Sequence, residues 1–247
     1  MHTRRRFMAA LAGLSTVPLA GLAPRHAQAG STKLLMLGDS MIAGGFGLFL
    51  AQDLEREHGY TVDRRGKSST GLARPDFYDW IRVGAAARAE AKPDAVLCMF
   101  GGNDGQGLYM GRHEKKGRTV SKWIRYGKPG WDPEYRRRIN RFADVVTAAG
   151  ERLIWVGMPP MRLDRLHERV DHMNDIFAAE MAIRPNARFV PIWDVLSKDG
   201  EYTDRLEIDG TRTRIRTGDG IHISSAGAHY LADFVRPHVV RLMDARA

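Results

Sequence analysis

The sequence predicts an α/β fold, a single-domain, doubly wound three-layer sandwich with about five parallel strands in the order 2-1-3-4-5. Apolar runs of strand length recur along the chain, and segments with a helical spacing of apolar residues separate them. Such alternation is typical of a parallel sheet that helices cover on both faces. No internal repeat or second-domain linker interrupts the pattern.

The strands are expected at residues 33–37, 60–65, 95–100, 153–157 and 188–192. The second of these is the weakest because it is short and partly polar. Helices are expected at residues 47–58, 76–91, 133–149 and 163–181. Ligands of such folds gather at the carboxyl ends of the strands, so the residues that follow each strand are the first candidates for a site.

Residues 1–29 are typical of an export signal. A charged start that contains Arg4 and Arg5 precedes an apolar stretch at residues 8–22, and Ala27-Gln28-Ala29 resembles a small-residue cleavage site. The stretch is too short and too broken to span a bilayer. The paired arginines favour the twin-arginine route, with an ordinary Sec signal or a basic tail as the alternatives. We therefore expect a periplasmic or otherwise exported protein cleaved near Ala29.

The domain expected at residues 30–247 is large enough for one substantial core. The signal holds four arginines and no acid, so its removal would lower the formal net charge from +9 to +5. This charge, without any DNA-reading motif, favours either an anionic envelope environment or a soluble basic surface over nucleic acid binding. The single cysteine, Cys98, excludes an intrachain disulfide and is expected in the core. The oligomeric state is not predicted.

Residues 109–131 depart from the alternation. This stretch carries seven Lys and Arg residues against one Glu, with Trp123, Tyr126 and Trp131 interleaved. We expect a long irregular insertion loop, which would be either a lid or polysaccharide-facing surface over the site, or a solvated insertion pinned by its aromatic residues.

Two short motifs follow expected strands. Gly38-Asp39-Ser40 follows the first strand and would present the Ser40 hydroxyl and N–H to the crevice. Gly101-Gly102-Asn103-Asp104 follows the third, where the Asn103 amide could donate to an oxyanion beside a narrow glycine backbone. Each motif alone is equally compatible with a plain turn or a helix cap.

A third motif, Asp219-Gly220-Ile221-His222, precedes an expected helix start at Ser224. Its spacing allows Asp219 to accept a hydrogen bond from one imidazole nitrogen of His222 while the other nitrogen takes the proton of Ser40. A turn-capping Asp219 with an exposed His222 is the alternative. Together, the three motifs predict a Ser-His-Asp site for acyl transfer.

These motifs, in this order, resemble the blocks of the SGNH (GDSL) hydrolase superfamily, which has a flavodoxin-like sheet. Four further matches resemble an exported bacterial branch, DUF459; they are Ser69-Thr70-Gly71-Leu72 with Trp80, the extension of the second motif to Gln106, residues 155–162, and the extension of the third to Ile223. The resemblance covers essentially the whole chain after the signal.

The resemblance implies Ser40 as nucleophile, His222 as base and Asp219 as its partner. It also implies an oxyanion hole formed by the Ser40 N–H, the Asn103 side chain and a glycine N–H. The usual Asn shortly before this glycine is missing here, which leaves Gly71 and Gly66 as the two candidates, and Gly71 is the one favoured. Further residues are expected to contact substrate; they are Asp39, Gly102, Asp104, Arg162 and Arg216. For the two arginines, surface salt bridging is the alternative.

Other chemistries are not supported. The elbow G-x-S-x-G of α/β-hydrolases is missing. His167 and His172 are five residues apart, so they do not share a helix face as zinc ligands would. No P-loop or G-x-G-x-x-G is present, and no metal or cofactor is implied.

The function expected is therefore that of an exported serine esterase that acts through an acyl-enzyme. Small O-acyl groups, such as acetyl, on an envelope or exported polysaccharide are the preferred substrates. An O-acetyltransferase that uses the same triad is one alternative. A non-catalytic carbohydrate-binding envelope protein is the other.

Overall fold

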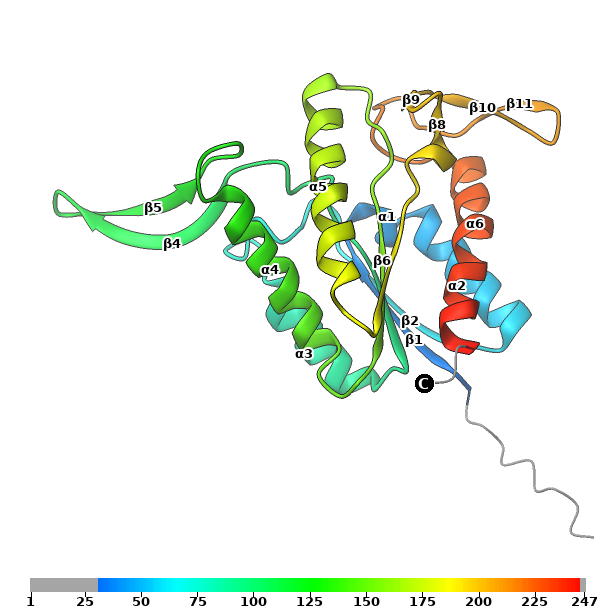
Figure 1. Cartoon of the computed structure of the whole chain (residues 1–247), viewed down its shortest axis with the longest axis horizontal. Helices are drawn as coiled ribbons and strands as arrows, with labels where there is room; N and C mark the ends of the chain where they lie inside the picture. Colours follow the sequence, from blue (N-terminus) through cyan, green and yellow to red (C-terminus); the bar gives the residue numbers. More distant parts are fainter. Residues whose placement is uncertain (1–30, 245–247) are drawn as a thin grey trace, which may run out of the picture. The chain divides into compact units, whose positions relative to one another are not determined.

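The computed structural model describes residues 31–244, so the expected export signal lies outside the described residues. A five-stranded sheet forms its centre (Figure 1). The strands are β1 (Lys33–Gly38), β2 (Thr61–Gly66), β3 (Ala95–Met99), β6 (Arg152–Val156) and β7 (Ala187–Val190). They run in the order β2-β1-β3-β6-β7 with every neighbouring pair parallel. This confirms the predicted order.

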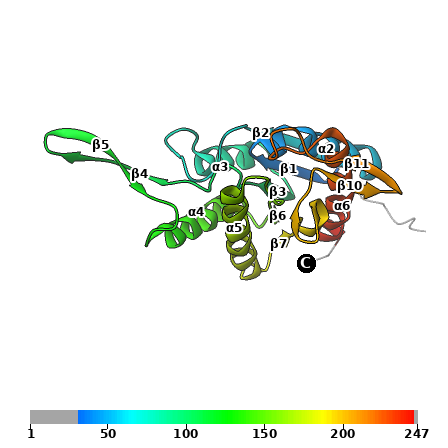
Figure 2. The same ribbon diagram turned by 90° about the horizontal axis from the view of Figure 1, so that it is seen from above.

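Helices cover both faces of the sheet, which confirms the three-layer prediction (Figures 1 and 2). On one face, α2 (Gly45–His58) packs against α6 (Ser225–Asp244). On the other, α4 (Trp131–Val146) packs against both α3 (Trp80–Ala91) and α5 (Asp164–Ala182). None of the helices within residues 31–244 has the length and apolar character that a membrane span requires.

Burial explains why two of the strands read as unbroken apolar runs. All five residues of β3 are buried, and all but the first residue of β1. Strands in the middle of a parallel sheet have both faces covered, so their side chains do not alternate between apolar and polar. Cys98 lies in β3 with no solvent exposure, as expected of a core residue.

The stretch at residues 109–131 is not an irregular loop. Strands β4 (Leu108–Lys115) and β5 (Arg118–Ile124) form an antiparallel hairpin that projects from the body of the domain (Figures 1 and 2). Both turn residues, Lys116 and Gly117, have positive φ angles of 51° and 71°. Two residues in this conformation match the twist of the flanking strands and so close a tight hairpin.

Between β7 and α6 lie a 3₁₀ turn, η1 (Asp194–Leu196), and two small hairpins that the sequence patterns did not predict. One joins β8 (Ser197–Lys198) to β9 (Glu201–Tyr202), and the other joins β10 (Arg205–Ile208) to β11 (Thr211–Arg214). Each turns at an Asp-Gly pair with positive φ at both residues. Asp-Gly between short strands indicates a hairpin. Here the strands on either side carry charged residues, so they lack the apolar runs by which strands are recognised in the sequence.

Candidate active site

Ser40 lies at the carboxyl end of β1, as the first residue of the short helix α1 (Ser40–Ala43). The Asp39 carboxylate caps this turn by accepting from the Met41 N–H at 3.0 Å. A side chain at Gly38 would place its Cβ 2.4 Å from the Met99 carbonyl oxygen. Only glycine therefore allows the end of β1 to lie this close to β3 and to fix where Ser40 emerges.

The loop before α6 brings Asp219 and His222 to the same edge. A backbone hydrogen bond of 2.9 Å from the Thr217 N–H to the His222 carbonyl closes this loop. Gly220 has a φ of +73°, and its neighbouring carboxylate oxygen, Asp219 Oδ1, accepts from the backbone N–H groups of Ile221 at 2.8 Å and His222 at 3.0 Å. The loop thus holds the carboxylate and the imidazole in fixed relation.

The three side chains form a continuous chain of hydrogen bonds. The distance from His222 Nε2 to Ser40 Oγ is 2.9 Å, and that from His222 Nδ1 to Asp219 Oδ2 is 2.7 Å. Burial opposes ionisation of Asp219, but hydrogen bonds from His222, Ile221 and Thr217 outweigh it and hold the pKa of Asp219 below its usual range. A carboxylate that stays charged favours the tautomer in which Nδ1 carries the proton, which leaves Nε2 to accept from Ser40.

Asn103 lies in the turn after β3. Its side-chain N–H groups donate to the Thr70 carbonyl at 3.0 Å and to Asp39 Oδ2 at 3.4 Å. The second of these bonds is long and weak, so one N–H can turn to another acceptor.

Ser40 opens into a cavity of about 250 Å³. Its lining residues come from the ends of β1, β2, β3 and β6 and from the loop before α6; they are Asp39, Ser40, Met41, Ser68, Ser69, Gly102, Asn103, Met158, Ile221 and His222. The structure thus brings together Ser40, His222, Asn103, Asp39 and Gly102 as the sequence predicted. The hairpin of β4 and β5 contributes none of the described lining residues of this cavity.

Asp39 and Asp104 are buried together beneath the cavity. Burial raises the pKa of Asp39 to about 7, and the neighbouring charge of Asp104 adds to the effect. The pKa of Asp104 is also raised by burial, although its carboxylate accepts from the N–H groups of Leu72 and Ala73 and from the Tyr135 hydroxyl. The expectation that Asp104 contacts substrate is wrong. Asp104 has no exposed surface, and its carboxylate anchors the Leu72–Ala73 backbone instead.

The position of the oxyanion glycine stays a prediction. A Cβ at Gly71 would lie 2.1 Å from Asp104 Oδ1, and a Cβ at Gly66 would lie 2.2 Å from the Ala43 nitrogen. Both positions therefore require glycine for close packing, whatever their chemical role. Gly71 lines a neighbouring cavity rather than that of Ser40. The residues of the same segment that line the cavity of Ser40 are Ser68 and Ser69.

The two predicted substrate arginines serve the Asp219–His222 loop. The Arg162 side chain donates to the Gly218 carbonyl at 2.9 Å, and it does not line the cavity of Ser40. Arg216 has no exposed surface, and it donates to the Ile221 carbonyl at 3.0 Å. The expectation of substrate contact by Arg216, and the alternative of a surface salt bridge, are wrong because the guanidinium is buried under the loop.

Sequence reasoning missed several lining residues of the cavity, namely Met41, Ser68, Ser69, Met158 and Ile221. A signal was present for two of them. Ser68 and Ser69 come two and three residues after β2, which the predicted order places beside β1. Ser69 also has a φ of 61°, a conformation that no sequence pattern indicated.

Several solved structures share this fold. A carbohydrate esterase of family 3 from Talaromyces cellulolyticus has a TM-score of 0.57 at 16% identity, covering 87% of this chain and 100% of its own. A GDSL-like lipase from Bacteroides thetaiotaomicron has a TM-score of 0.55 at 15% identity, covering 85% and 88%. An acetyl esterase mutant with an acetate ion has a TM-score of 0.56 at 16% identity, covering 87% and 100%.

At this level of identity the likeness shows the fold alone, which is that of the SGNH (GDSL) hydrolases. A search of curated proteins found no match. A family model described as "Protein of unknown function (DUF459)" matches residues 33–238, which is most of the chain. By this match, the chain belongs to the DUF459 family.

Proposed function

We propose that this protein is a serine ester hydrolase that acts through an acyl-enzyme. The observation that carries the proposal is the hydrogen-bonded chain from Ser40 Oγ through His222 to Asp219, with heavy-atom distances of 2.9 Å and 2.7 Å. A serine hydroxyl is a weak nucleophile at neutral pH, and a base oriented by a carboxylate is the arrangement that activates it.

In the first half-reaction, Ser40 Oγ attacks the ester carbon as His222 Nε2 takes the hydroxyl proton. The tetrahedral intermediate then collapses, and the alcohol leaves with the proton that His222 returns. In the second half, His222 takes a proton from water as the water oxygen attacks the acyl-Ser40 carbon. Ser40 leaves with that proton, and the carboxylic acid is released. Asp219 stabilises the imidazolium in both halves.

Two groups are proposed to stabilise the oxyanion. The Ser40 N–H makes no hydrogen bond with the described residues, and it stands at the first position of α1. Asn103 can give up its weak 3.4 Å bond to Asp39 and donate to the oxyanion instead. We propose the Gly71 N–H as the third donor because the family resemblance implies a glycine here, and this N–H makes no hydrogen bond with the described residues. Gly71 does not line the cavity of Ser40 in this structure, so its N–H has to turn toward that cavity when substrate binds.

The substrates proposed are short O-acyl esters, such as acetyl esters, on an exported polysaccharide. A cavity of about 250 Å³ is smaller than the usual range for drug-sized ligands, which favours a small acyl group. The structural neighbours named as a carbohydrate esterase and an acetyl esterase support the same direction.

Labelling with a fluorophosphonate probe tests the nucleophile. The wild type should form one adduct at Ser40 and should hydrolyse p-nitrophenyl acetate faster than the octanoate. Ser40→Ala should do neither, while Ser69→Ala, which changes another serine of the same cavity, should still be labelled. If no adduct forms at Ser40 and no short ester is hydrolysed, the serine esterase function is excluded, and the alternative of a non-catalytic carbohydrate-binding protein is the one to test.

Product analysis separates hydrolysis from transfer. With an activated acetyl ester and an acceptor oligosaccharide, a hydrolase releases acetate at the same rate with or without the acceptor. An O-acetyltransferase would instead form acetylated sugar in place of free acetate. Accumulation of acetyl-sugar as the main product would replace hydrolysis by transfer in this proposal.

We also propose that the protein is exported by the twin-arginine route, on the strength of the paired Arg4 and Arg5 before the apolar stretch. Replacing both by lysine should leave the uncleaved precursor inside the cell. Normal export of that variant would assign the signal to the Sec route.

A further inference from the structure

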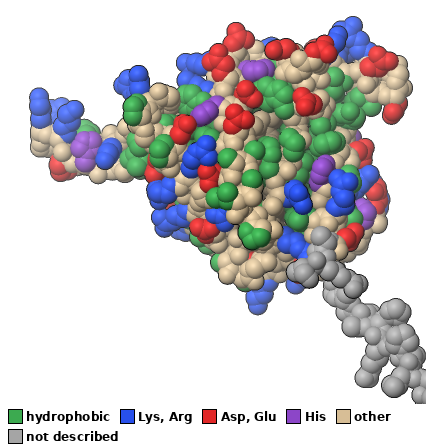
Figure 3. Space-filling model, in the orientation of Figure 1, with side chains coloured by type: hydrophobic (Ala, Val, Ile, Leu, Met, Phe, Trp, Pro, Cys, Tyr) green, Lys and Arg blue, Asp and Glu red, His purple; other side chains and the backbone are tan. Residues whose placement is uncertain are grey.

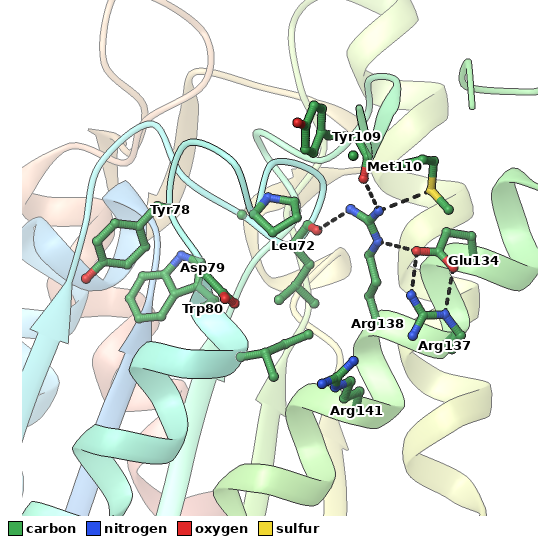
Figure 4. Close-up of a pocket in the computed structure, with 14 residues that line it drawn as sticks. Leu72, Tyr78, Asp79, Trp80, Tyr109, Met110, Glu134, Arg137, Arg138 and Arg141 are labelled. Carbon is green, nitrogen blue, oxygen red and sulfur yellow. Dashed lines mark hydrogen bonds and ion pairs between the residues drawn. The ribbon is translucent and has the colours of Figure 1, made fainter. Parts of the chain in front are cut away.

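A second cavity, of about 300 Å³, lies beside the segment that flanks the active site (Figure 4). The start of α3, one side of α4 and the base of the β4–β5 hairpin enclose it. Aromatic side chains line one part of it. Tyr78 comes just before α3, Trp80 is the first residue of α3, and Tyr109 belongs to the hairpin. Arg137, Arg138 and Arg141 line the part formed by α4.

Arg138 fixes the walls of this cavity. Its buried guanidinium donates to the carbonyl oxygens of Leu72 and Ala73, each at 2.9 Å, and to that of Tyr109. The Tyr109 N–H also donates to the Ala73 carbonyl at 3.0 Å. The base of the hairpin and the segment after Gly71 are therefore held together in advance, so the cavity is a formed site rather than a gap between loops.

The guanidinium groups of α4 differ in how they are paired. Arg138 and Arg137 both bind the Glu134 carboxylate, at 2.7 Å each. Arg141 stands one turn further along α4 and is exposed, and within residues 31–244 it makes no hydrogen bond or ion pair. Figure 4 accordingly draws dashed lines to Arg137 and Arg138 but none to Arg141. An unpaired guanidinium at the rim of a formed cavity is suited to a carboxylate or another oxyanion.

The β4–β5 hairpin carries further basic and aromatic side chains away from the body of the domain. Lys and Arg side chains gather along it and at its tip, as Figure 3 shows. Near its base, Trp123 is 41% exposed, and its ring packs edge-on against Tyr109 at 5.2 Å and under the Arg74 guanidinium at 5.0 Å. Flat aromatic faces bind the C–H faces of sugar rings, and guanidinium groups bind the anionic groups that acidic sugars carry.

One segment joins this cavity to the active site. Ser68 and Ser69 line the cavity of Ser40, whereas Gly71 and Leu72 line the second cavity. Between them, Thr70 accepts from the Asn103 side chain through its carbonyl and from the Trp80 indole N–H, at 2.9 Å, through its hydroxyl. A polymer could therefore occupy both cavities by passing over this one segment.

We propose that the second cavity binds an anionic sugar residue of a polysaccharide, with Arg141 pairing the carboxylate of a uronate. The acylated substrate is then an acidic polysaccharide, and this part of the inference rests on the esterase function proposed above. Binding of the acidic sugar to the cavity does not depend on turnover.

Titration of full-length Ser40→Ala protein with polygalacturonate, a uronate polymer, tests the inference. Isothermal calorimetry should detect binding that weakens as salt is added, and dextran, a neutral polymer, should not bind. Arg141→Ala in the same background should weaken binding about tenfold, the loss expected for one charge-assisted hydrogen bond. Arg141→Lys keeps the charge but not the planar fork of the guanidinium. Its affinity for the polymer should lie between those of the parent and of Arg141→Ala.

Arg212→Ala supplies the matched control, because Arg212 is exposed on β11 and lines neither cavity. It should bind the polymer as the parent does. Equal loss in the Arg212 and Arg141 variants would mean non-specific charge binding and would overturn the proposal, as would equal binding of dextran or no polymer binding at all. Wild-type turnover of p-nitrophenyl acetate is measured in parallel. Its absence, with polymer binding intact, would remove the esterase function and leave the sugar site standing.

Discussion

His222 Nε2 lies 2.9 Å from Ser40 Oγ although 182 residues separate them in the sequence. The packing of α2 against α6 holds the two loops together. Phe49 of α2 stacks on His229 of α6 with ring centroids 3.6 Å apart, and a Cβ at Gly45 would lie 3.2 Å from that of Ala228. The geometry of the triad therefore depends on a helix interface that lies just behind it.

Asp219→Asn should lower kcat for p-nitrophenyl acetate by about 10⁴-fold, by analogy with the same change in a serine protease, with little effect on KM. An amide at this position can donate to Nδ1, which favours the tautomer with the proton on Nε2 and removes the base for Ser40. Steady-state kinetics at neutral pH measure the effect.

Thr217→Val is the milder comparison. It removes one donor, the 2.7 Å bond from the Thr217 hydroxyl to Asp219 Oδ1, and leaves the carboxylate in place. Its kcat should fall about tenfold or less, as expected for one hydrogen bond. If Asp219→Asn kept activity similar to that of Thr217→Val, the carboxylate would not be the group that orients His222.

Asp39→Asn should change how stability depends on pH. Burial raises the pKa of Asp39 to about 7 in the folded protein, whereas in the unfolded chain the carboxyl titrates near 4. Between these values the folded state holds a proton that the unfolded state has lost. The wild type therefore loses stability as pH rises from about 4 to about 7, by at most about 1.4 kcal/mol per pH unit from this group.

The amide that replaces the Asp39 carboxyl does not titrate, so the variant should lack this component. Urea unfolding of both proteins at several pH values gives the difference in their free energies of unfolding, in which the contributions of other groups cancel. The free energy of unfolding of the variant should increase relative to that of the wild type as pH rises from about 4 to about 7. Parallel curves would mean that Asp39 is ionised in the folded protein throughout.

Much of the fold could be predicted because its determinants are local. The buried runs of β1 and β3 have the length and composition of central strands, and the order of the sheet follows from the alternation of strands and helices. Ser40 and Asn103 could be placed at one edge because each follows a strand whose carboxyl end lies there, whereas His222 was joined to them by the chemistry of its motif. The motif spacing of Asp219 and His222 is also local, within a single turn.

The errors concern side chains whose role is set by distant contacts. Asp104 adjoins Asn103 in sequence, but it points into the core because the Leu72 and Ala73 N–H groups and the Tyr135 hydroxyl meet it there. Arg216 is charged and precedes the Asp219 loop, yet it is fully buried under that loop. Nothing in the local sequence distinguishes a buried arginine that supports a loop from an exposed one that could reach a substrate.

Gly71→Ala should destabilise the fold by roughly 1–3 kcal/mol, because the new Cβ would meet a carboxylate held in place from three sides. For a domain of this size, each kcal/mol corresponds to a fall in Tm of about 2–4 °C. Gly218→Ala is the matched control, because no atom lies within 4 Å of the Cβ it would add. Thermal unfolding compares the two. Equal Tm values would show that the Asp104 carboxylate moves aside at little cost.

Arg216→Met should lower kcat/KM for p-nitrophenyl acetate by about 10- to 100-fold while changing the free energy of unfolding by only about 1 kcal/mol. Burial lowers the pKa of Arg216 to about 10, and its Nε and Nη1 atoms have no hydrogen-bond partner among the described residues, so removing the charge relieves a cost. That gain offsets the loss of the donor to the Ile221 carbonyl, which leaves the loop that carries His222 less firmly placed. Kinetics and urea unfolding on the same preparation measure both quantities. A stability loss of several kcal/mol with kcat/KM unchanged per folded molecule would show that Arg216 supports the fold and does not position the base.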